Sequence, residues 1–204
     1  MPPPQEILAG LSRIANGWPG IAIAWHLYFA LLLATLHPGM RRSRRTMAVL
    51  LTLPLLSVAA LAWIEGNPFN GSVLSFAALA LLVLAARMPS GQARRAGPAW
   101  TLAGTAILAF GWVYPHFLDT TEPLVYLYAA PAGLVPCPTL AVATGLALVL
   151  RGLDSLAWPL LLAACGLFYG LFGALVLGVH LDWVLAAGAS LLLVSVLLNR
   201  RSGS

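Results

Sequence analysis

Residues 41–65 read RRSRRTMAVLLTLPLLSVAALAWIE: two pairs of arginines, a long apolar run and a closing glutamate. As a helix, the apolar run at 47–64 would be about 27 Å long, close to the thickness of the hydrocarbon core of a bilayer. Positive side chains collect on the cytoplasmic side of membrane helices. This stretch therefore predicts a helix that crosses a membrane from an arginine-bearing cytoplasmic turn to an acidic outer turn.

The rest of the chain repeats this unit. Of the 204 residues, 60% are hydrophobic and 8% are charged, which is too little charge to cover a soluble domain of this size. The predicted fold class is therefore all-α, a polytopic membrane protein with a bundle of seven transmembrane helices. The expected crossings are 18–36, 47–64, 72–88, 99–118, 133–150, 157–178 and 183–199.

Charge alternates along the gaps between these segments. Arginine follows the first, third, fifth and seventh segments, whereas the other gaps carry Glu65, then Asp119 and Glu122, then Asp182, and no arginine. Seven crossings, with the N-terminus outside and the C-terminus cytoplasmic, reproduce this pattern. Because the net charge of +5 resides largely in short turns beside apolar runs, the expected partner is the lipid bilayer and not nucleic acid.

Three regions follow from this topology. Residues 1–17 are an outer interfacial segment, in which Ile7, Leu8, Leu11 and Ile14 recur at helical spacing. That spacing predicts a short helix at 5–16 lying along the membrane surface; a disordered tail is the alternative. Residues 18–199 form the seven-helix transmembrane domain, and residues 200–204 form a cytoplasmic tail.

The start of the fifth segment, residues 130–139, reads APAGLVPCPT. A proline lacks an N–H and clashes with the carbonyl four residues back, so Pro136 and Pro138 should free the carbonyls of Ala132 and Leu134. Lipid cannot satisfy such groups, so this end should be kinked or unwound and buried against neighbours. Broken helices of this kind line substrate and ion sites in transporters. A kink that only shapes packing is the alternative.

A ligand-binding site is predicted around this break. An ionisable side chain near mid-membrane is costly and is a functional candidate, which makes His26 the expected protonatable group. The alternatives are a neutral, hydrogen-bonded imidazole at His26 and an inert buried thiol at Cys137. The predicted site comprises His26, Ala132, Leu134, Pro136, Cys137, Pro138, Thr139 and Tyr169.

The outer turns also carry a candidate site for a divalent metal. His116 and Asp119 are three residues apart and would share a helix face. Together with His180 and Asp182 they offer ligands of the types that divalent metals use. The alternative is that Asp182 simply caps the seventh helix ahead of Trp183.

Two cofactors are not expected. His26 and His37 lie on nearly the same helix face, but the other histidines belong to the outer end, so a bis-histidine haem would have ligands at poorly matched depths. The chain has no lysine, which excludes a retinal Schiff base.

The sixth segment carries a face of small residues. Gly166, Gly170 and Gly173 flatten one side of the expected helix and predict close packing there. The contact lies either within the bundle or against a membrane protein partner.

At residues 130–139 the chain resembles an uncharacterised family of bacterial multi-pass membrane proteins. That family carries an Ala-Pro pair followed by Gly and Pro-Cys-Pro-Thr at the head of a late helix. Tyr114-Pro115-His116, Asn67-Pro68 and the glycine-rich stretch 173–182 are also similar, and the resemblance covers most of 18–199. It implies a multi-pass protein of the bacterial cytoplasmic (inner) membrane and transfers no activity.

Three functional hypotheses follow. The leading one is a small-molecule or ion transporter, channel or sensor with its site at the broken fifth helix, where His26→Ala or Cys137→Ala would abolish binding. The second is a non-catalytic accessory subunit that binds a partner, lipid or pigment through its glycine face. The third is a metal-binding or redox membrane protein. The residues offer no enzyme motif such as a Walker sequence, CxxC, HExxH or GxSxG.

Overall fold

The structure, a computed structural model, describes residues 3–36 and 42–201. Within these residues the protein is all-α, as predicted, and contains no strand. The elements in chain order are α1 (Pro4–Gly17), α2 (Pro19–Ala34), α3 (Arg44–Ile64), α4 (Pro68–Ala86), α5 (Pro98–Val113), η1 (Pro123–Val125), α6 (Tyr126–Ala129), α7 (Pro136–Val149), η2 (Arg151–Asp154), α8 (Ala157–Leu171), η3 (Phe172–Val176) and α9 (Asp182–Arg201).

Local sequence sets where the helices begin. α2, α4, α5 and α7 each start with a proline, whose missing N–H is not needed in the first turn. Side chains cap α3 and α4: Ser43 Oγ accepts from the N–H of Thr46, and Asn67 Oδ1 accepts from the N–H of Asn70, each over 3.0 Å.

Each of the seven predicted segments coincides with one long helix, namely α2, α3, α4, α5, α7, α8 and α9. Several predicted bounds were wrong, among them the start of the third segment, because α4 begins at Pro68 and not at 72. α5 ends at Val113 and not at 118, because Pro115 follows, and α7 begins at Pro136 and not at 133. The helix expected at 5–16 is confirmed as α1, which buries Leu11 and Ile14.

Four helices are long and apolar enough to cross a bilayer: α3, α4, α8 with η3, and α9 as far as Asn199. α1 and α2, bent by 76° at their junction, qualify as a fifth if they are counted as one span. α5 and α7 are apolar but shorter, with 16 and 14 residues. By length and composition, then, the described chain holds four or five candidate membrane spans.

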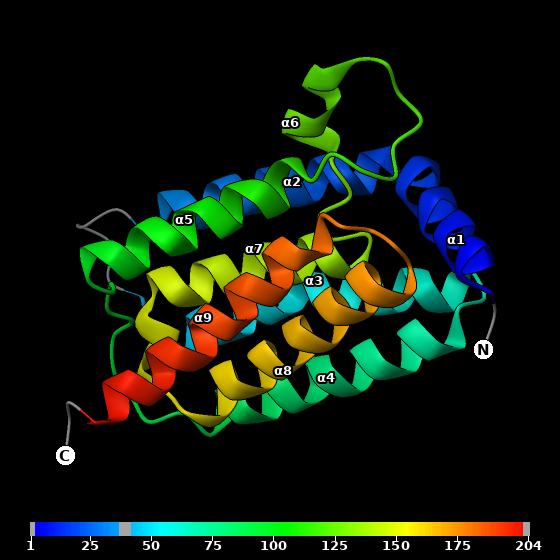
Figure 1. Cartoon of the computed structure of the whole chain (residues 1–204). Coiled ribbons are helices and arrows are strands. Elements are labelled where there is room, and N and C mark those ends of the chain that lie inside the picture. The colour runs from blue at the N-terminus through cyan, green and yellow to red at the C-terminus, as the bar shows by residue number, and fades with distance from the viewer. Residues whose placement is uncertain (1–2, 37–41, 202–204) are drawn as a thin grey trace.

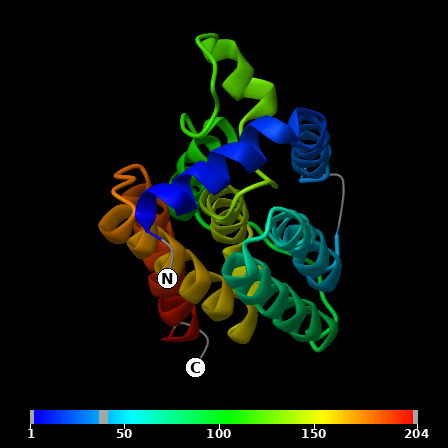
Figure 2. The ribbon, with the colours of Figure 1, turned by 90° about the vertical axis from the view of Figure 1, so that its right-hand side faces the viewer.

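α7 lies in the middle of the bundle, packed against α3, α5, α8 and α9 (Figures 1 and 2). Every residue of α7 except Cys137 is buried, as its uniformly apolar sequence requires. Glycines let the neighbouring α5 approach its backbone: a Cβ at Gly104 would lie 2.6 Å from the carbonyl oxygen of Gly145. α7 therefore has little lipid-facing surface.

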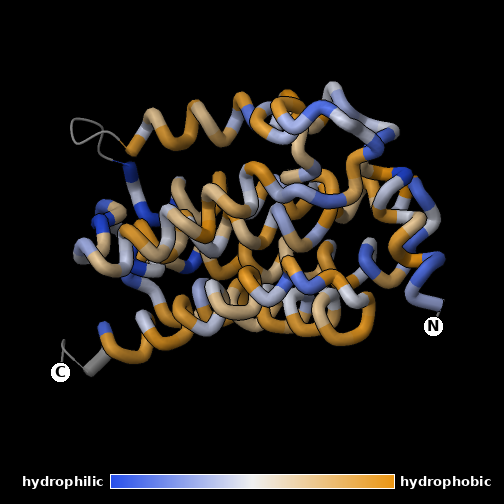
Figure 3. The backbone as a smooth tube through the Cα atoms, turned by 45° about the horizontal axis from the view of Figure 1, so that its top comes forward, coloured by the Kyte–Doolittle hydropathy of each residue, from blue (hydrophilic) through white to orange (hydrophobic). Residues whose placement is uncertain are grey.

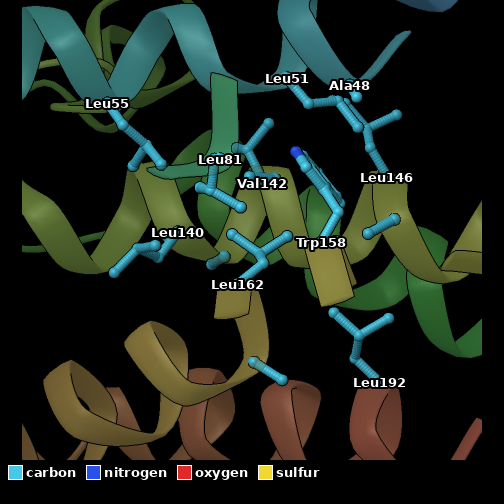
Figure 4. Close-up of a cluster of buried hydrophobic side chains, with 14 of the residues drawn as sticks. Ala48, Leu51, Leu55, Leu81, Leu140, Val142, Leu146, Trp158, Leu162 and Leu192 are labelled. Atoms are coloured by element: carbon cyan, nitrogen blue, oxygen red, sulfur yellow. The ribbon is translucent and has the colours of Figure 1, made fainter. Parts of the chain in front are cut away.

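The core lies where α3, α4, α7, α8 and α9 meet (Figure 4). Trp158 of α8 is fully buried there and points between Leu51 of α3 and Leu146 of α7. Leu162 and Leu192 extend the same cluster toward α9. This packing fixes α7 relative to the helices around it.

The bundle has two chemically different ends, and hydrophilic residues gather at both (Figure 3). At the arginine end, comprising residues 42–45, 87–97 and 151–156, the N–H of Arg44 binds the carbonyl of Gly91 and Arg94 pairs with Asp154. At the acid end, comprising residues 65–67, 114–122 and 178–182 and all of α1, Trp18 Nε1 donates to Glu65 Oε1 over 3.4 Å.

The arginine-bearing turns that the structure describes thus lie together, as the predicted alternation requires. Asp154 was not considered in the predicted alternation and departs from it, because it is an acidic residue at the arginine end. α1 and the C-terminal end of α9 lie at opposite ends of the bundle (Figure 1).

Candidate functional site

The chain before α7 is unwound and buried, as expected for a broken helix. Residues 129–136 are all buried, and Gly133 has a φ of +84° with its Cα against the Trp25 ring. The N–H of Gly133 donates to Thr139 Oγ1, whose hydroxyl donates to the carbonyl of Val135, both over 2.7 Å. This buried turn leads directly into the first residue of α7.

The predicted origin of this break was wrong. Pro136 and Pro138 occupy the first turn of α7, where a helix leaves its N–H groups unpaired in any case. The carbonyls of Ala132 and Leu134 lie in the turn before the helix, so neither proline takes them out of a helical hydrogen-bond pattern. The prolines start the helix and do not kink it.

Asp182, the first residue of α9, is the centre of a buried polar cluster. Its side chain is 1% exposed. Tyr114 Oη donates to Asp182 Oδ1 over 2.6 Å, and the Cys137 thiol donates to Oδ2 over 3.2 Å. A buried carboxylate is costly unless hydrogen-bonded, and these two donors together with the N-terminal dipole of α9 supply the compensation.

Gly173 makes room for this carboxylate. A Cβ at position 173 would overlap Asp182 Oδ2. Gly173 lies in η3, a π-helical turn that continues α8, and such turns in α-helices are frequent at functional sites. The cluster therefore joins the end of α5, the start of α7, η3 and the start of α9.

A second pair of polar side chains lies next to Cys137. Tyr169 Oη donates to Asn70 Oδ1 over 3.2 Å, and Asn70 is only 7% exposed. The amide nitrogen of Asn70 has no hydrogen-bond partner among the described residues. This nitrogen is not itself buried, because Asn70 lines the cavity described next, where a ligand or water can accept from it.

These side chains border a cavity of about 290 Å³ at the acid end. Asn70, Cys137 and Tyr169 supply polar groups to it. Glu6, Arg13 and Glu65 supply charged groups, of which Glu6 and Arg13 come from the exposed side of α1. Most other lining side chains are apolar or aromatic, among them Ile7, Leu11, Phe69, Phe117, Val135, Pro136, Phe172 and Leu177.

The cavity receives three of the eight residues predicted for the ligand site, namely Pro136, Cys137 and Tyr169. Ala132, Leu134, Pro138 and Thr139 are buried beside it without lining it.

His26 is also away from the cavity. It lies between α2 and α5, with Nδ1 2.9 Å from the carbonyl oxygen of Ala22 and Nε2 3.1 Å from that of Trp112. Both partners are acceptors, and a neutral imidazole carries one N–H, so in that form one of the two contacts is a hydrogen bond, which fits the alternative of a hydrogen-bonded imidazole. His37, the other histidine considered for haem, lies outside the described residues.

The predicted metal site gains no support. Among the described residues, no group of three or more His, Cys, Asp or Glu side chains is placed to hold a metal ion. The carboxylate of Asp182 points to Tyr114 and Cys137, the ring of His116 packs 4.3 Å from that of Phe117, and His180 is exposed. The four residues share an end of the bundle without forming a coordination site.

The glycine face of α8 is occupied within the chain. Gly166 packs against the Cβ of Ala189, and a Cβ at Gly170 would lie 2.7 Å from the backbone nitrogen of Ala186. Because α9 covers this face, a partner subunit would have to bind elsewhere.

Sequence reasoning missed several of these residues. Asn70 was not predicted as a site residue, although a polar amide next to an apolar segment needs a hydrogen-bond partner and for that reason indicates a candidate site. The pairing of Asp182 with Tyr114 joins residues 68 positions apart and has no local signature.

Together, fold and cavity define a class: a helical bundle with membrane-length helices and a largely apolar, partly polar cavity at one end. The chain matches no model of a protein family, no curated protein and no solved structure.

Proposed function

We propose that this chain is a seven-crossing integral membrane protein that binds a small, mainly apolar molecule in the cavity beside α7, as the binding step of transport or sensing. The unpaired amide of Asn70 at this cavity carries the proposal. A neutral ligand with one hydrogen-bond acceptor would satisfy it, while the aromatic and aliphatic walls would hold the rest of the ligand.

The short α5 and α7 are compatible with seven crossings. α7 would span about 21 Å, but it is enclosed by other helices, and the buried segment 130–135 continues it toward the acid end. Unwound backbone is tolerated at membrane depth where protein encloses it. Positive-inside bias would place the arginine end in the cytoplasm and the cavity on the outer side. The resemblance noted above points to the bacterial inner membrane.

An inorganic ion fits the cavity less well than a neutral molecule. Glu6, Glu65 and Arg13 carry charges of both signs, and Glu6 and Arg13 lie on exposed positions of α1. No ring of like-charged groups surrounds the polar groups next to α7, where the neutral Asn70, Tyr169 and Cys137 are found. Selective ion sites are built from convergent oxygen ligands or from charged rings.

Benzophenone tests the proposal directly, because it is a neutral aromatic ketone that on irradiation inserts into nearby C–H bonds. The purified full chain in a neutral detergent would be irradiated with it and the adducts mapped by peptide mass spectrometry. We expect adducts on cavity walls such as Phe69, Phe172 and Leu177. Asn70→Leu, which removes the donor at similar size, should reduce them about tenfold, corresponding to loss of one hydrogen bond of about 1.4 kcal/mol.

The matched control is Asn199→Leu, the same substitution at the other end of the bundle. It should leave labelling of the cavity unchanged. Adducts spread evenly over the lipid-facing helices, with no enrichment at the cavity, would overturn the proposal, as would equal labelling of the wild type and Asn70→Leu.

A further inference from the structure

A second, smaller cavity of about 130 Å³ lies at the arginine end. It is bounded by the residues leading into α5, by the end of α7, by η2 and by the C-terminal half of α9. Arg95, Trp100, Arg151, Ser195 and Asn199 supply its polar lining groups. All five can donate hydrogen bonds, and none of the described residues that line the cavity carries a carboxylate.

The positive charge around this cavity is neutralised only in part by the described residues. Asp154 is the acidic residue nearest to it in sequence, and Arg94 engages its carboxylate through two hydrogen bonds of 2.9 and 3.0 Å. That pairing raises the pKa of Arg94 further above its ordinary value. Arg151 is 3.5 Å from the same carboxylate, and Arg95 donates to the carbonyl of Leu36. Among the described residues, Arg94 and Arg151 thus share the single carboxylate of Asp154, and Arg95 has no acidic partner, which leaves an excess of positive charge at the cavity.

The backbone that presents Arg151 is strained. Arg151, Leu153 and Asp154 all have positive φ values, +54°, +59° and +47°, although none is glycine. Such conformations are unfavourable for residues with a side chain and persist where the surroundings demand them. Here the turn buries Leu153 completely and places Arg151 at the cavity.

We propose that this cavity binds a phosphate group through the side chains of Arg95 and Arg151. Guanidinium groups recognise phosphate oxygens in a bidentate manner, and clefts lined by one sign of charge concentrate ions of the other sign. The first turn of α5, which begins at Pro98 without a side-chain cap, adds backbone N–H groups at the same end. The phosphate would come from the headgroup of an anionic lipid or from free phosphate.

Calorimetric titration of the purified full chain in a neutral detergent tests the proposal. The probes are dioctanoyl phosphatidic acid, inorganic phosphate, and dioctanoylglycerol, which is the same lipid without the phosphate. Phosphatidic acid should bind at least tenfold more tightly than dioctanoylglycerol. Binding of phosphatidic acid alone identifies a lipid headgroup site, whereas comparable binding of inorganic phosphate identifies a site for the free anion.

Variants assign the binding to this cavity. Arg95→Gln and Arg151→Gln should each weaken phosphatidic acid binding about tenfold, the loss of one charge-assisted contact. Arg87→Gln, at the same end but away from the cavity, should bind like the wild type. Arg95→Lys keeps the positive charge but loses the planar guanidinium group, so its affinity for phosphatidic acid should lie between those of the wild type and Arg95→Gln. Such an intermediate affinity distinguishes loss of the site from loss of the fold. Equal binding of phosphatidic acid and dioctanoylglycerol, or full affinity in the double glutamine variant, would overturn the proposal.

Discussion

Tyr114 Oη donates a 2.6 Å hydrogen bond to Oδ1 of Asp182, and the two side chains are 0% and 1% exposed. The bond ties the end of α5 to the start of α9. The Cys137 thiol on the other carboxylate oxygen joins this pair to α7, directly beside the larger cavity. The shape of the proposed ligand site therefore depends on a buried carboxylate that keeps both of its donors.

Removing one donor should destabilise the fold. Tyr114→Phe leaves Asp182 buried with one partner fewer, and we expect a loss of about 1.5–3 kcal/mol of unfolding free energy. Tyr128→Phe is the control, because the Tyr128 side chain is half exposed. Denaturant unfolding in detergent measures both variants. Equal stability of the two would show that the bond to Asp182 contributes nothing.

Gly173→Ala should lower the unfolding midpoint sharply, because the new methyl group would overlap the Asp182 carboxylate. Gly20→Ala, at a helical position with nothing within 4 Å, should be neutral or stabilising. Asp182→Ala introduced on top of Gly173→Ala should restore part of the loss, a non-additive result expected of groups in contact. Strictly additive effects would mean that the two residues do not meet.

His26→Phe should separate stability from ligand binding. The imidazole lies within hydrogen-bond distance of the carbonyl oxygens of Ala22 in α2 and Trp112 in α5, so its loss should lower the unfolding midpoint by weakening the contact of α2 with α5. Labelling of the larger cavity by benzophenone should persist, since His26 does not line it. Loss of labelling in a folded His26→Phe protein would return His26 to the site in which the sequence first placed it.

Apolar periodicity and proline placement predicted where the helices lie. The run 47–64 became α3, from Arg44 to Ile64, and the spacing of Leu11 and Ile14 correctly predicted α1. The start of α7 was misjudged because a proline in the first turn and a proline inside a helix look alike in sequence.

The site was predicted in part. Pro136 and Cys137 were predicted from the proline-rich start of the fifth segment and Tyr169 as a neighbour of that start, and all three line the cavity. Asp182 was interpreted as a helix cap or metal ligand, because its contact with Tyr114 depends on how α5 and α9 pack. The left-handed turn that presents Arg151 could not be predicted from local sequence either. Glycine is the residue that usually marks positive φ values, and only one residue of this turn is glycine.

Thiol labelling in intact cells tests whether the two ends of the bundle lie on opposite sides of a membrane. Ser90→Cys and Thr121→Cys place thiols at exposed positions of the arginine end and the acid end. The unmodified chain, whose Cys137 and Cys165 are partly buried, gives the background. A membrane-impermeant maleimide should label Thr121→Cys in intact cells and Ser90→Cys only after permeabilisation. Labelling of both variants from the same side would contradict the account.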